Sequence, residues 1–529
     1  MPISGVRKND SGNARQAAQV ARTNYPKKEP ERVQSNFGIF KILRVIGVYK
    51  DIMPGTTALI ESSSRQHLFV FLVSIASFMG TLDSTIVNIS LPNIANYYNT
   101  SIALVSWIPI AYLLTLASTL IAFGHFADVH GYRKVYISGF LVFTVASFLC
   151  AISPSIGILI GCRILQGLGA AMLQAIGGAM IAVYLPRQVR GWALGMLSTF
   201  AALGVAVGPV LGGYLTEYLS WHWIFLVNIP VGICAVILGK LVMPNDPPVE
   251  NSPSAFDLAG AVLLFISLGS FIFTISMGRS FGYTSIIILG TATIFVLGTV
   301  AFLYRELHVA YPLIRLTLFK NRDYSLGNAG LLCVFVLYLG TSFLMPFYLE
   351  QGRGFTTNIA GLFMLVPALA LITTSSIAGR ISDRIGSRIL CIAAGLCFTG
   401  SMILFTTLCT STPIIIVVAN LILFGCSLGL FIAPNFKLLM GHAPPGEEGV
   451  VSSLAMTVRN TGSSVGVAVF STLFVTVAGI VSAGPGITAS QRDLGLHSAF
   501  LFGCAVALVI LITAFYSHER EDPASDNPE

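Results

Sequence analysis

The chain has 529 residues, of which 54% are hydrophobic and 10% are charged, against roughly 25% charged residues in an ordinary soluble domain. So few charges cannot solvate the surface of a soluble protein of this length, which argues against a cytosolic enzyme, a nucleic-acid binder or a disulfide-stapled secreted module and indicates a membrane protein. The formal net charge is +7, and most of the excess lies in residues 1–66, where basic residues outnumber acidic ones.

Residues 1–66 are polar and precede the first long apolar run. They contain one mixed stretch, Phe37 to Tyr49, which is too short and too charged to cross a bilayer. A long polar leader precedes this stretch and no cleavage-like site follows it, so it does not resemble a signal peptide. We expect a cytosolic tail whose amphipathic piece lies on the membrane and binds anionic lipid; plain disorder is the alternative.

Apolar runs long enough to cross about 30 Å of hydrocarbon recur from His67 onward, with short breaks between them. They predict about fourteen helices, at 67–91, 102–126, 135–154, 156–184, 191–218, 221–243, 257–278, 283–304, 325–349, 358–378, 389–409, 413–435, 450–480 and 499–517. An even number of spans places both termini on one side. Most Lys and Arg residues between spans fall in loops on that side, so we expect a multi-pass cell-membrane protein with cytosolic N- and C-termini.

A loop motif occurs twice and divides the chain into halves. The loop after the second span carries Gly124, Asp128, Gly131, Arg133 and Lys134, and the loop after the tenth repeats the pattern 255 positions later, with Gly379, Asp383, Gly386 and Arg388. The matching loops lie eight helices apart, whereas two six-helix halves would place them six apart. The surplus predicts two additional helices, and parallel halves with a site between them are typical of secondary transporters.

The predicted organisation is therefore all-α, with two pseudo-symmetric six-helix halves and two extra helices. Its parts are a basic N-terminal tail (1–66), an N-terminal half (67–243), two linker helices (257–304), a cytosolic amphipathic linker (305–324), a C-terminal half (325–517) and a C-terminal tail (518–529).

The repeated loop is expected to act as a gate on the cytosolic side. Glycine suits a sharp turn, and Asp128 at a helix end can pair with Arg133 or cap a neighbouring helix. Such a charge clamp would latch the two halves and release as they rock. The alternative is that the loop charges only direct membrane topology.

Asp83 is the one carboxylate clearly inside a span, and an ionised Asp at mid-helix costs roughly 2.5 to 3.5 kcal/mol on insertion scales. Arg163 is the matching exception on the fourth span, and Gln166 and Gln174 share its helical face. Asp83 and Arg163 lie at similar depth, so we expect them to face each other. Protonation of Asp83 would weaken the pair and couple transport to protons; a permanent structural ion pair is the alternative.

Two charged residues of the second half are further candidates for substrate contact. Arg459 lies about two turns into the thirteenth span, where it would make a gating contact or snorkel to the cytosolic surface. Glu350 ends the ninth span and is expected to be a solvated end charge. With Asn88, Gln166 and Gln174, Arg459 completes the predicted substrate cavity.

Other chemistries lack their residues. No Lys is followed by Ser or Thr, so no phosphate-binding loop is present, and neither H-E-x-x-H nor C-x-x-C occurs. We therefore expect no enzyme activity, no metal and no cofactor, and, for any uphill transport, an ion gradient or a separate subunit as the energy source.

The motifs together resemble those of the fourteen-helix drug:proton antiporters of the major facilitator superfamily. The resemblance covers about 67–517 and is carried by the stretch from Leu82 to Pro92, the loop from Gly124 to Lys134, the stretch from Cys162 to Gly169, and the glycine-rich fifth span with Gly204, Gly208, Pro209, Gly212 and Gly213. In that family, acidic first-span and basic fourth-span residues are tied to proton coupling, which here implies Asp83 and Arg163. The fifth-span pattern marks antiporters and implies a seal against ion leak; ordinary helix packing is the alternative.

The resulting functional hypothesis is a proton-coupled antiporter for multidrug efflux. It would export lipophilic, neutral or monocationic small molecules by rocking of the two halves, with the proton gradient in place of a cofactor. Expected partners are a small lipophilic or cationic substrate, protons and membrane lipids, with no nucleic acid and a monomeric state. Two alternatives remain: an exporter of one endogenous metabolite, amino acid or siderophore, and a non-transporting membrane sensor.

Overall fold

A computed structural model of the chain describes residues 60, 62–246, 257–309, 312–444, 448–479 and 488–518. The chain divides into two compact units, residues 1–53 and 54–529, and every described residue belongs to the second. The predicted membrane-surface stretch from Phe37 to Tyr49 therefore lies outside the described residues.

Fourteen helices in the described ranges are long and apolar enough to cross a membrane, which confirms the predicted all-α architecture. In the N-terminal half they are α3 (Ser63–Tyr97), α4 with α5 (Ile102–Val105 and Trp107–His130), α6 (Tyr132–Ala151), α7 (Ile156–Tyr184), α8 (Arg187–Tyr218), and α9 with α10 (Trp223–Leu226 and Asn228–Val242). The additional pair is α11 (Leu258–Phe281) and α12 (Ile286–His308). The C-terminal half holds α13 with η3 (Arg322–Phe347 and Tyr348–Gly352), α14 (Thr357–Ile385), α15 (Ser387–Thr406), α16 (Ile414–Gly441), α17 (Glu448–Ala478) and α18 (Ala489–Tyr516).

Several helices continue beyond the apolar runs that predict them. The last helix begins at Ala489 instead of near residue 499, and Thr488 and Gln491 form a capping box at its start. Hydropathy marks the part of a helix that crosses hydrocarbon, whereas capping and main-chain hydrogen bonds set where the helix itself begins. A search for apolar runs therefore misses the polar first turns of such helices.

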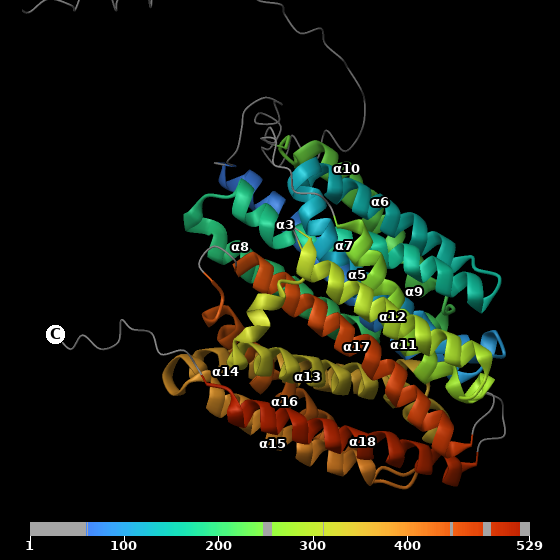
Figure 1. Cartoon of the computed structure of the whole chain (residues 1–529). Helices are drawn as coiled ribbons and strands as arrows, with labels where there is room; N and C mark the ends of the chain where they lie inside the picture. The colour runs from blue at the N-terminus through green and yellow to red at the C-terminus, as the bar shows by residue number, and fades with distance from the viewer. Residues whose placement is uncertain are drawn as a thin grey trace, which may run out of the picture. The chain divides into compact units, whose positions relative to one another are not determined.

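The two halves use matching helix contacts. In the first half α3 packs on α8 and α6 on α7; in the second α13 packs on α17 and α14 on α16. Figure 1 shows these as a blue-to-green and a yellow-to-red set of helices, with α17 running beside α5. Gly131 between α5 and α6 and Gly386 between α14 and α15 have φ of 97° and 84°. This left-handed backbone favours glycine, so the repeated loop has the same turn in both halves.

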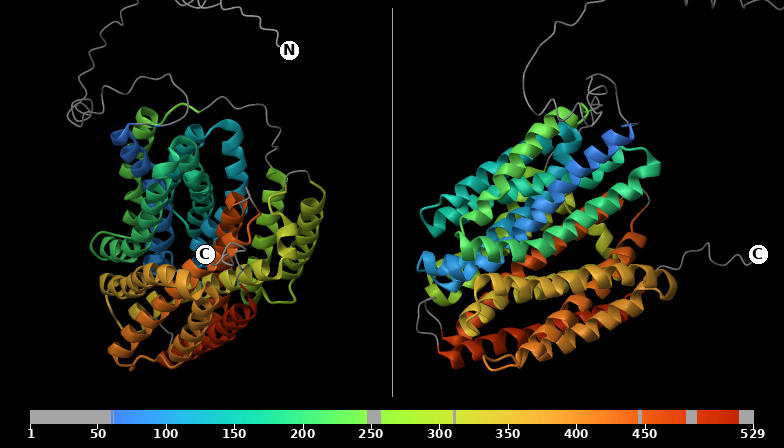
Figure 2. Two further views of the ribbon diagram at one scale, coloured as in Figure 1. Left: turned by 90° about the vertical axis from the view of Figure 1, so that its left-hand side faces the viewer. Right: turned by 180° about the vertical axis from the view of Figure 1, so that it is seen from behind.

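The additional helices form a hairpin beside both halves. Helix α11 packs against α12, and also against α5 of the first half and α17 of the second (Figure 2). Helix α12 exposes large apolar side chains along its length, among them Leu289, Leu297 and Val300. A surface of this kind is suited to lipid. The short η2 helix (Leu316–Lys320) then precedes α13.

The two halves join at the face where α3 ends, here called the far face; the face where α3 begins and α18 ends is the terminal face. At the far face, Asn93 donates to Glu350 Oε2 at 3.1 Å and to Thr357 Oγ1 at 2.9 Å. The Thr357 amide donates to Glu217 Oε2 at 3.0 Å. In the right-hand view of Figure 2, α3 and α8 diverge from the C-terminal half toward the terminal face. The halves are thus closed against each other at the far face.

Candidate functional site

Asp83 of α3 and Arg163 of α7 form a buried ion pair. Arg163 Nη1 lies 2.5 Å from Asp83 Oδ2, and neither side chain is exposed at all. The structure therefore brings together the two charged residues that stand out inside the apolar spans. The short distance between them is compatible with a role in proton coupling and with a purely structural ion pair. The contacts of the pair with its neighbours therefore bear on which role is favoured.

Three further polar groups complete what we call the Asp83 cluster. Gln166 donates to Asp83 Oδ1 at 2.8 Å and accepts from Arg163 Nη1 at 2.6 Å. Asn228, the first residue of α10, donates to Asp83 Oδ1 at 3.2 Å, and Ser147 of α6 accepts from Gln166 at 2.8 Å. Asp83 thus receives hydrogen bonds from two helices of its own half. Both carboxylate oxygens of Asp83 therefore have hydrogen-bond partners.

The Asp83 cluster is expensive to disturb at one member only. Removing one partner of a buried pair leaves an uncompensated charge and costs about 3 to 5 kcal/mol in soluble proteins. One guanidinium nitrogen of Arg163, Nη2, is buried without a hydrogen-bond partner among the described residues. The cluster therefore leaves one hydrogen-bond donor of Arg163 unsatisfied in this part of the chain.

Tyr112 of α5 links the Asp83 cluster to the space between the halves. The Arg163 guanidinium carbon lies 4.3 Å from the centroid of the Tyr112 ring, and the Tyr112 hydroxyl donates to the Gly80 carbonyl at 3.2 Å. The same ring lines a pocket between the halves. A molecule in that pocket would press on the ring that stacks against Arg163.

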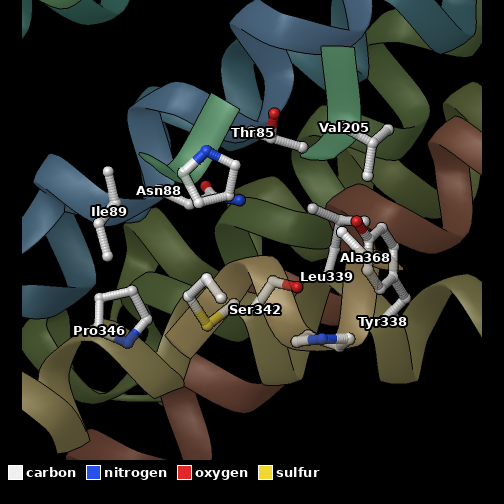
Figure 3. Close-up of a pocket in the computed structure, with 12 residues that line it drawn as sticks. Thr85, Asn88, Ile89, Val205, Tyr338, Leu339, Ser342, Pro346 and Ala368 are labelled. Atoms are coloured by element: carbon white, nitrogen blue, oxygen red, sulfur yellow. The ribbon is translucent and has the colours of Figure 1, made fainter. Parts of the chain in front are cut away.

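Two adjacent pockets lie between the halves, and together they are called the central cavity. Figure 3 shows the first, where Thr85, Asn88 and Val205 face Leu339 and Ser342 of α13. The second shares residues 85, 205, 338 and 339 with the first and extends to Tyr112, Gln174, Phe335, Arg459, Asn460 and Ser463. Their volumes of about 20 and 30 Å³ have room for only one to three water molecules. The cavity must widen before it can hold a substrate.

Three of the four predicted cavity residues line the central cavity. Asn88 lines the first pocket, where both polar atoms of its amide are buried without a hydrogen-bond partner among the described residues. Gln174 and Arg459 line the second pocket. Gln166 lines neither, because its amide is fully buried and occupied by the Asp83 cluster. Gln166 shares a helical face with Arg163, but that face of α7 is turned toward the Asp83 cluster and not toward the cavity.

Arg459 of α17 faces the cavity and does not snorkel to the membrane surface. Its guanidinium carbon lies 5.2 Å from the Phe335 ring centroid, within the range of a cation–π contact. Among the described residues it has neither a carboxylate partner nor a side-chain hydrogen bond. No carboxylate lines the central cavity in this part of the chain, so the cavity wall carries an uncompensated positive charge.

Sequence reasoning missed Asn228, Ser147 and Tyr112. Asn228 is a lone amide inside an otherwise apolar run, and that signal marks it as a candidate in hindsight. Tyr112 and Ser147 carry no comparable signal, because Tyr and Ser are common in membrane helices. Only the packing of α5 and α6 against α7 shows their role.

The first loop motif contacts its own half and does not bridge the halves. Asp128 accepts a hydrogen bond from Tyr132 at 2.5 Å and does not pair with Arg133. The Arg133 guanidinium instead donates to the Lys240 carbonyl in the last turn of α10 and to the Asn245 side chain after that helix, and the Arg133 main-chain amide donates to Asp246 at 2.8 Å. The expected ion pair between Asp128 and Arg133 is therefore wrong for this conformation, because Arg133 binds the last turn of α10 and the residues that follow it.

The second loop motif behaves in the same way. Asp383 pairs with Lys437 of α16 at 2.9 Å, and Arg388 donates to the Phe515 carbonyl of α18 at 2.6 Å. Both contacts stay within the C-terminal half. No latch between the halves is formed at the terminal face by these residues in this conformation, where the helices diverge. Lys134, Gly124 and Gly379 have no contact here that bridges the halves among the described residues.

The glycine motif of α8 serves two interfaces. A Cβ on Gly204, Gly208 or Gly212 would lie 2.1 to 2.6 Å from atoms of α3, so these three allow close packing within the first half. Gly213 faces α14, where a Cβ would lie 2.6 Å from the Thr357 carbonyl. Gly361 of α14 approaches the Pro209 carbonyl in turn, at 2.4 Å for an added Cβ. The motif thus joins α3 to α8 and brings the halves together at the far face.

Glu350 is not the solvated end charge that the sequence suggests. Its Oε2 accepts from Asn93 and Thr357, and its Oε1 is buried without a partner among the described residues. The prediction is wrong because the opposite half covers the end of this helix. Within the described ranges, no group of three or more His, Cys, Asp or Glu side chains is arranged to hold a metal ion.

Comparison with known proteins identifies the family. Residues 73–467 match the Major Facilitator Superfamily model. The chain is 34% identical to the riboflavin transporter RibZ of Clostridioides difficile (strain 630) over 78% of this chain and 88% of that protein. It is 30% identical to the multidrug resistance protein Stp of Mycobacterium tuberculosis (strain CDC 1551 / Oshkosh), over 76% and 75%. The fold matches the crystal structure of a bacterial homolog of the human lysosomal transporter Spinster, with a TM-score of 0.62, 13% identity and coverage of 87% and 98%. The chain is therefore a multi-pass membrane transporter that belongs to the major facilitator superfamily, in the fourteen-helix drug:proton antiporter family that its motifs resemble.

Proposed function

We propose that the protein is a proton-coupled antiporter that exports small lipophilic molecules by alternating access of the central cavity. The observation that carries this proposal is the Asp83 cluster, a fully buried ion pair that touches the cavity wall through Tyr112. An intramembrane carboxylate is expensive and marks a functional site by default. Its connection to the cavity favours coupling over a purely structural pair.

The proposed cycle uses Asp83 as the proton carrier. Proton binding neutralises the carboxylate and leaves Arg163 with its hydrogen bonds to Gln166 and the Ile108 carbonyl and its contacts with the Tyr112 and Phe225 rings. The link between α3 and α7 then weakens, and α3 moves with α8, to which it is closely packed through the glycine motif. Asp83 has no exposed surface in this conformation, so a substrate in the cavity acts on it indirectly, through Tyr112.

The proposed orientation and partners follow the loop charges. We infer that the terminal face is cytosolic and that the protein resides in the cell membrane, with protons and small molecules as its ligands. A monomer is sufficient, because the cavity is lined by both halves of one chain. Anionic lipid at the N-terminal tail remains part of this proposal and concerns residues outside the described ranges.

A second candidate is an exporter of one metabolite. The 34% identity to a riboflavin transporter over most of both chains favours it. Export of a panel of unrelated compounds supports multidrug efflux, whereas a response to one compound class alone supports the metabolite exporter.

The coupling proposal is tested with Asp83→Asn in proteoliposomes that contain a pH-sensitive dye. Substrate-evoked proton movement should fall at least tenfold, because Asn cannot carry a proton across the cycle. Asp383→Asn is the control, because Asp383 is an exposed aspartate whose ion pair with Lys437 stays within the C-terminal half. It should keep proton movement within about twofold of the wild type.

Retention of substrate binding by Asp83→Asn shows that the variant is folded. Proton movement that persists undiminished in this folded variant would refute the coupling role of Asp83. Transport that proceeds without any proton movement in the wild type would refute antiport itself.

A further inference from the structure

One charged side chain of the central cavity, that of Arg459, has no acidic partner among the described residues. Arg459 reaches the second pocket from α17, and in the described part of the chain no acidic side chain lies within ion-pair distance of its guanidinium. Burying a charge without a partner is unfavourable, and such a residue in a membrane helix is retained where it meets a ligand, an ion or water. The position of Arg459 therefore bears on the sign of the charge that a ligand in this cavity would carry.

The Asp83 carboxylate does not serve as a counter-ion for Arg459, because it is already engaged. Asp83 accepts from Arg163, Gln166 and Asn228, and none of its surface is exposed. The two arginines thus have different surroundings in this conformation. Arg163 is paired with Asp83, whereas Arg459 lines the cavity without an acidic partner among the described residues. A cationic substrate would find no acid in the cavity and would be repelled by Arg459.

The rest of the second pocket is lined by aromatic, aliphatic and polar residues. Tyr112, Phe335 and Tyr338 present rings from α5 and α13, and Gln174, Asn460 and Ser463 supply amide and hydroxyl groups. Flat rings bind flat apolar ligands, and an arginine guanidinium binds carboxylates and similar anions in a charge-assisted manner. The combination suits an aromatic molecule that carries one anionic group.

We propose that Arg459 binds the anionic group of the exported substrate, so that the transported molecules are amphipathic aromatic anions, not cations. This inference rests on the proposed transport function and assigns its substrate class. It revises the expectation of neutral or cationic compounds, because the charge on the cavity wall has the opposite sign from the one that a cation needs.

The proposal predicts how transport responds to membrane potential. Export of one monoanion removes one negative charge from the cytosol, and entry of one proton adds one positive charge to it. A one-for-one exchange therefore makes the cytosol more positive by two elementary charges per cycle. A potential that is negative on the cytosolic side therefore accelerates export even without a pH difference. One-for-one exchange of a proton for a monocation is electroneutral and would not respond.

Binding to the purified full chain is measured with three ligands of the same ring system. These are naphthalene-2-sulfonate, the neutral naphthalene-2-sulfonamide and the cationic trimethyl-2-naphthylammonium. The wild type should bind the sulfonate at least tenfold more tightly than the other two. Arg459→Met should reduce this preference to within about threefold, whereas Arg459→Lys should retain most of it.

Arg380→Met is the matched control, because Arg380 is an exposed arginine near the terminal end of α14; it should bind all three ligands like the wild type. Equal binding of the sulfonate and the sulfonamide by the wild type, or a preference that survives in Arg459→Met, overturns the proposal. If Arg459→Met does not fold, sulfonate transport by the wild type decides: acceleration by a cytosol-negative potential at equal pH supports the proposal, and indifference overturns it.

The two proposals fail in different ways. Asp83-dependent proton movement evoked by the cationic ligand but not by the sulfonate would overturn the anion site and leave the antiporter intact. Arg459-dependent sulfonate binding without any evoked proton movement would leave the anion site intact and overturn proton antiport.

Discussion

At the scale of single residues, two arginines with different surroundings define the candidate site. Arg163 is fully buried and paired with Asp83, whereas Arg459 lines the cavity without an acidic partner among the described residues. Tyr112 lies next to both environments, because its ring stacks on Arg163 and lines the pocket that Arg459 enters. Under the proposed function, Tyr112 is the side chain through which a substrate in the cavity would act on Asp83, the proposed proton carrier.

Tyr112→Leu should uncouple substrate from protons, and Tyr112→Phe should not. The leucine loses the ring that lies 4.3 Å from the Arg163 guanidinium, a contact worth about 0.5 to 2 kcal/mol, so substrate-evoked proton release should fall by roughly 2- to 30-fold. The phenylalanine keeps the ring and loses only the hydroxyl bond to Gly80. Proton release in proteoliposomes is the measurement, and equal behaviour of the two variants would show that the ring plays no part in coupling.

At the scale of helices, α8 is the element that connects packing to closure. Its glycines allow it to lie against α3 on one side and α14 on the other. A backbone carbonyl lies where a side chain at Gly361 would be, so the far face closes only because both helices carry small residues at the crossing. The glycine motif therefore has a structural explanation in the approach of the halves, beyond packing inside one half.

Gly361→Ala should favour an open far face. The added Cβ would lie 2.4 Å from the Pro209 carbonyl oxygen, and overpacking of this kind typically costs about 1 to 3 kcal/mol. Disulfide formation between Asn93→Cys and Thr357→Cys, in a chain without the native cysteines, should fall roughly 5- to 100-fold. Gly379→Ala on the same helix has open space around its Cβ and should leave cross-linking unchanged. Unchanged cross-linking in Gly361→Ala would mean that α8 and α14 part by another route.

At the scale of the whole described unit, the additional helix α11 contacts both halves. It packs on α5 and on α17, and Arg279 at its far end donates to the Val475 and Thr476 carbonyls at the end of α17. Helices that touch both halves must slide or part as the halves rock. The extra pair is therefore expected to influence the balance between conformations and not the chemistry of the site.

Arg279→Gln should loosen the far end of α17. Hydrogen bonds from a charged donor are worth about 1.5 to 3 kcal/mol each where they are well formed, so amide hydrogen exchange over residues 470–479 should accelerate roughly tenfold or more. Arg187→Gln, an exposed arginine at the start of α8, is the control and should leave this segment unchanged. Exchange that stays at the wild-type rate in Arg279→Gln would show that α11 does not hold α17.

The sequence by itself determined the class of protein, the number of membrane helices, the repeated halves and the family. These properties are local, because hydrophobic runs report on membrane crossing and a repeated loop reports on duplication wherever the helices lie. Asp83 and Arg163 were found for the same reason, since a lone charge inside an apolar run is visible without any knowledge of its neighbours.

Only the tertiary structure decided which groups those residues meet. Asn228 reaches Asp83 across 145 positions of the chain, and Asn93 reaches Glu350 across 257. Arg133 turned to the end of α10, Gln166 joined the ion pair, and Arg459 faced the cavity, none of which follows from helical periodicity alone. The rotation of each helix about its axis and the crossing of one helix over another depend on contacts between distant segments, and those contacts set the charge of the cavity.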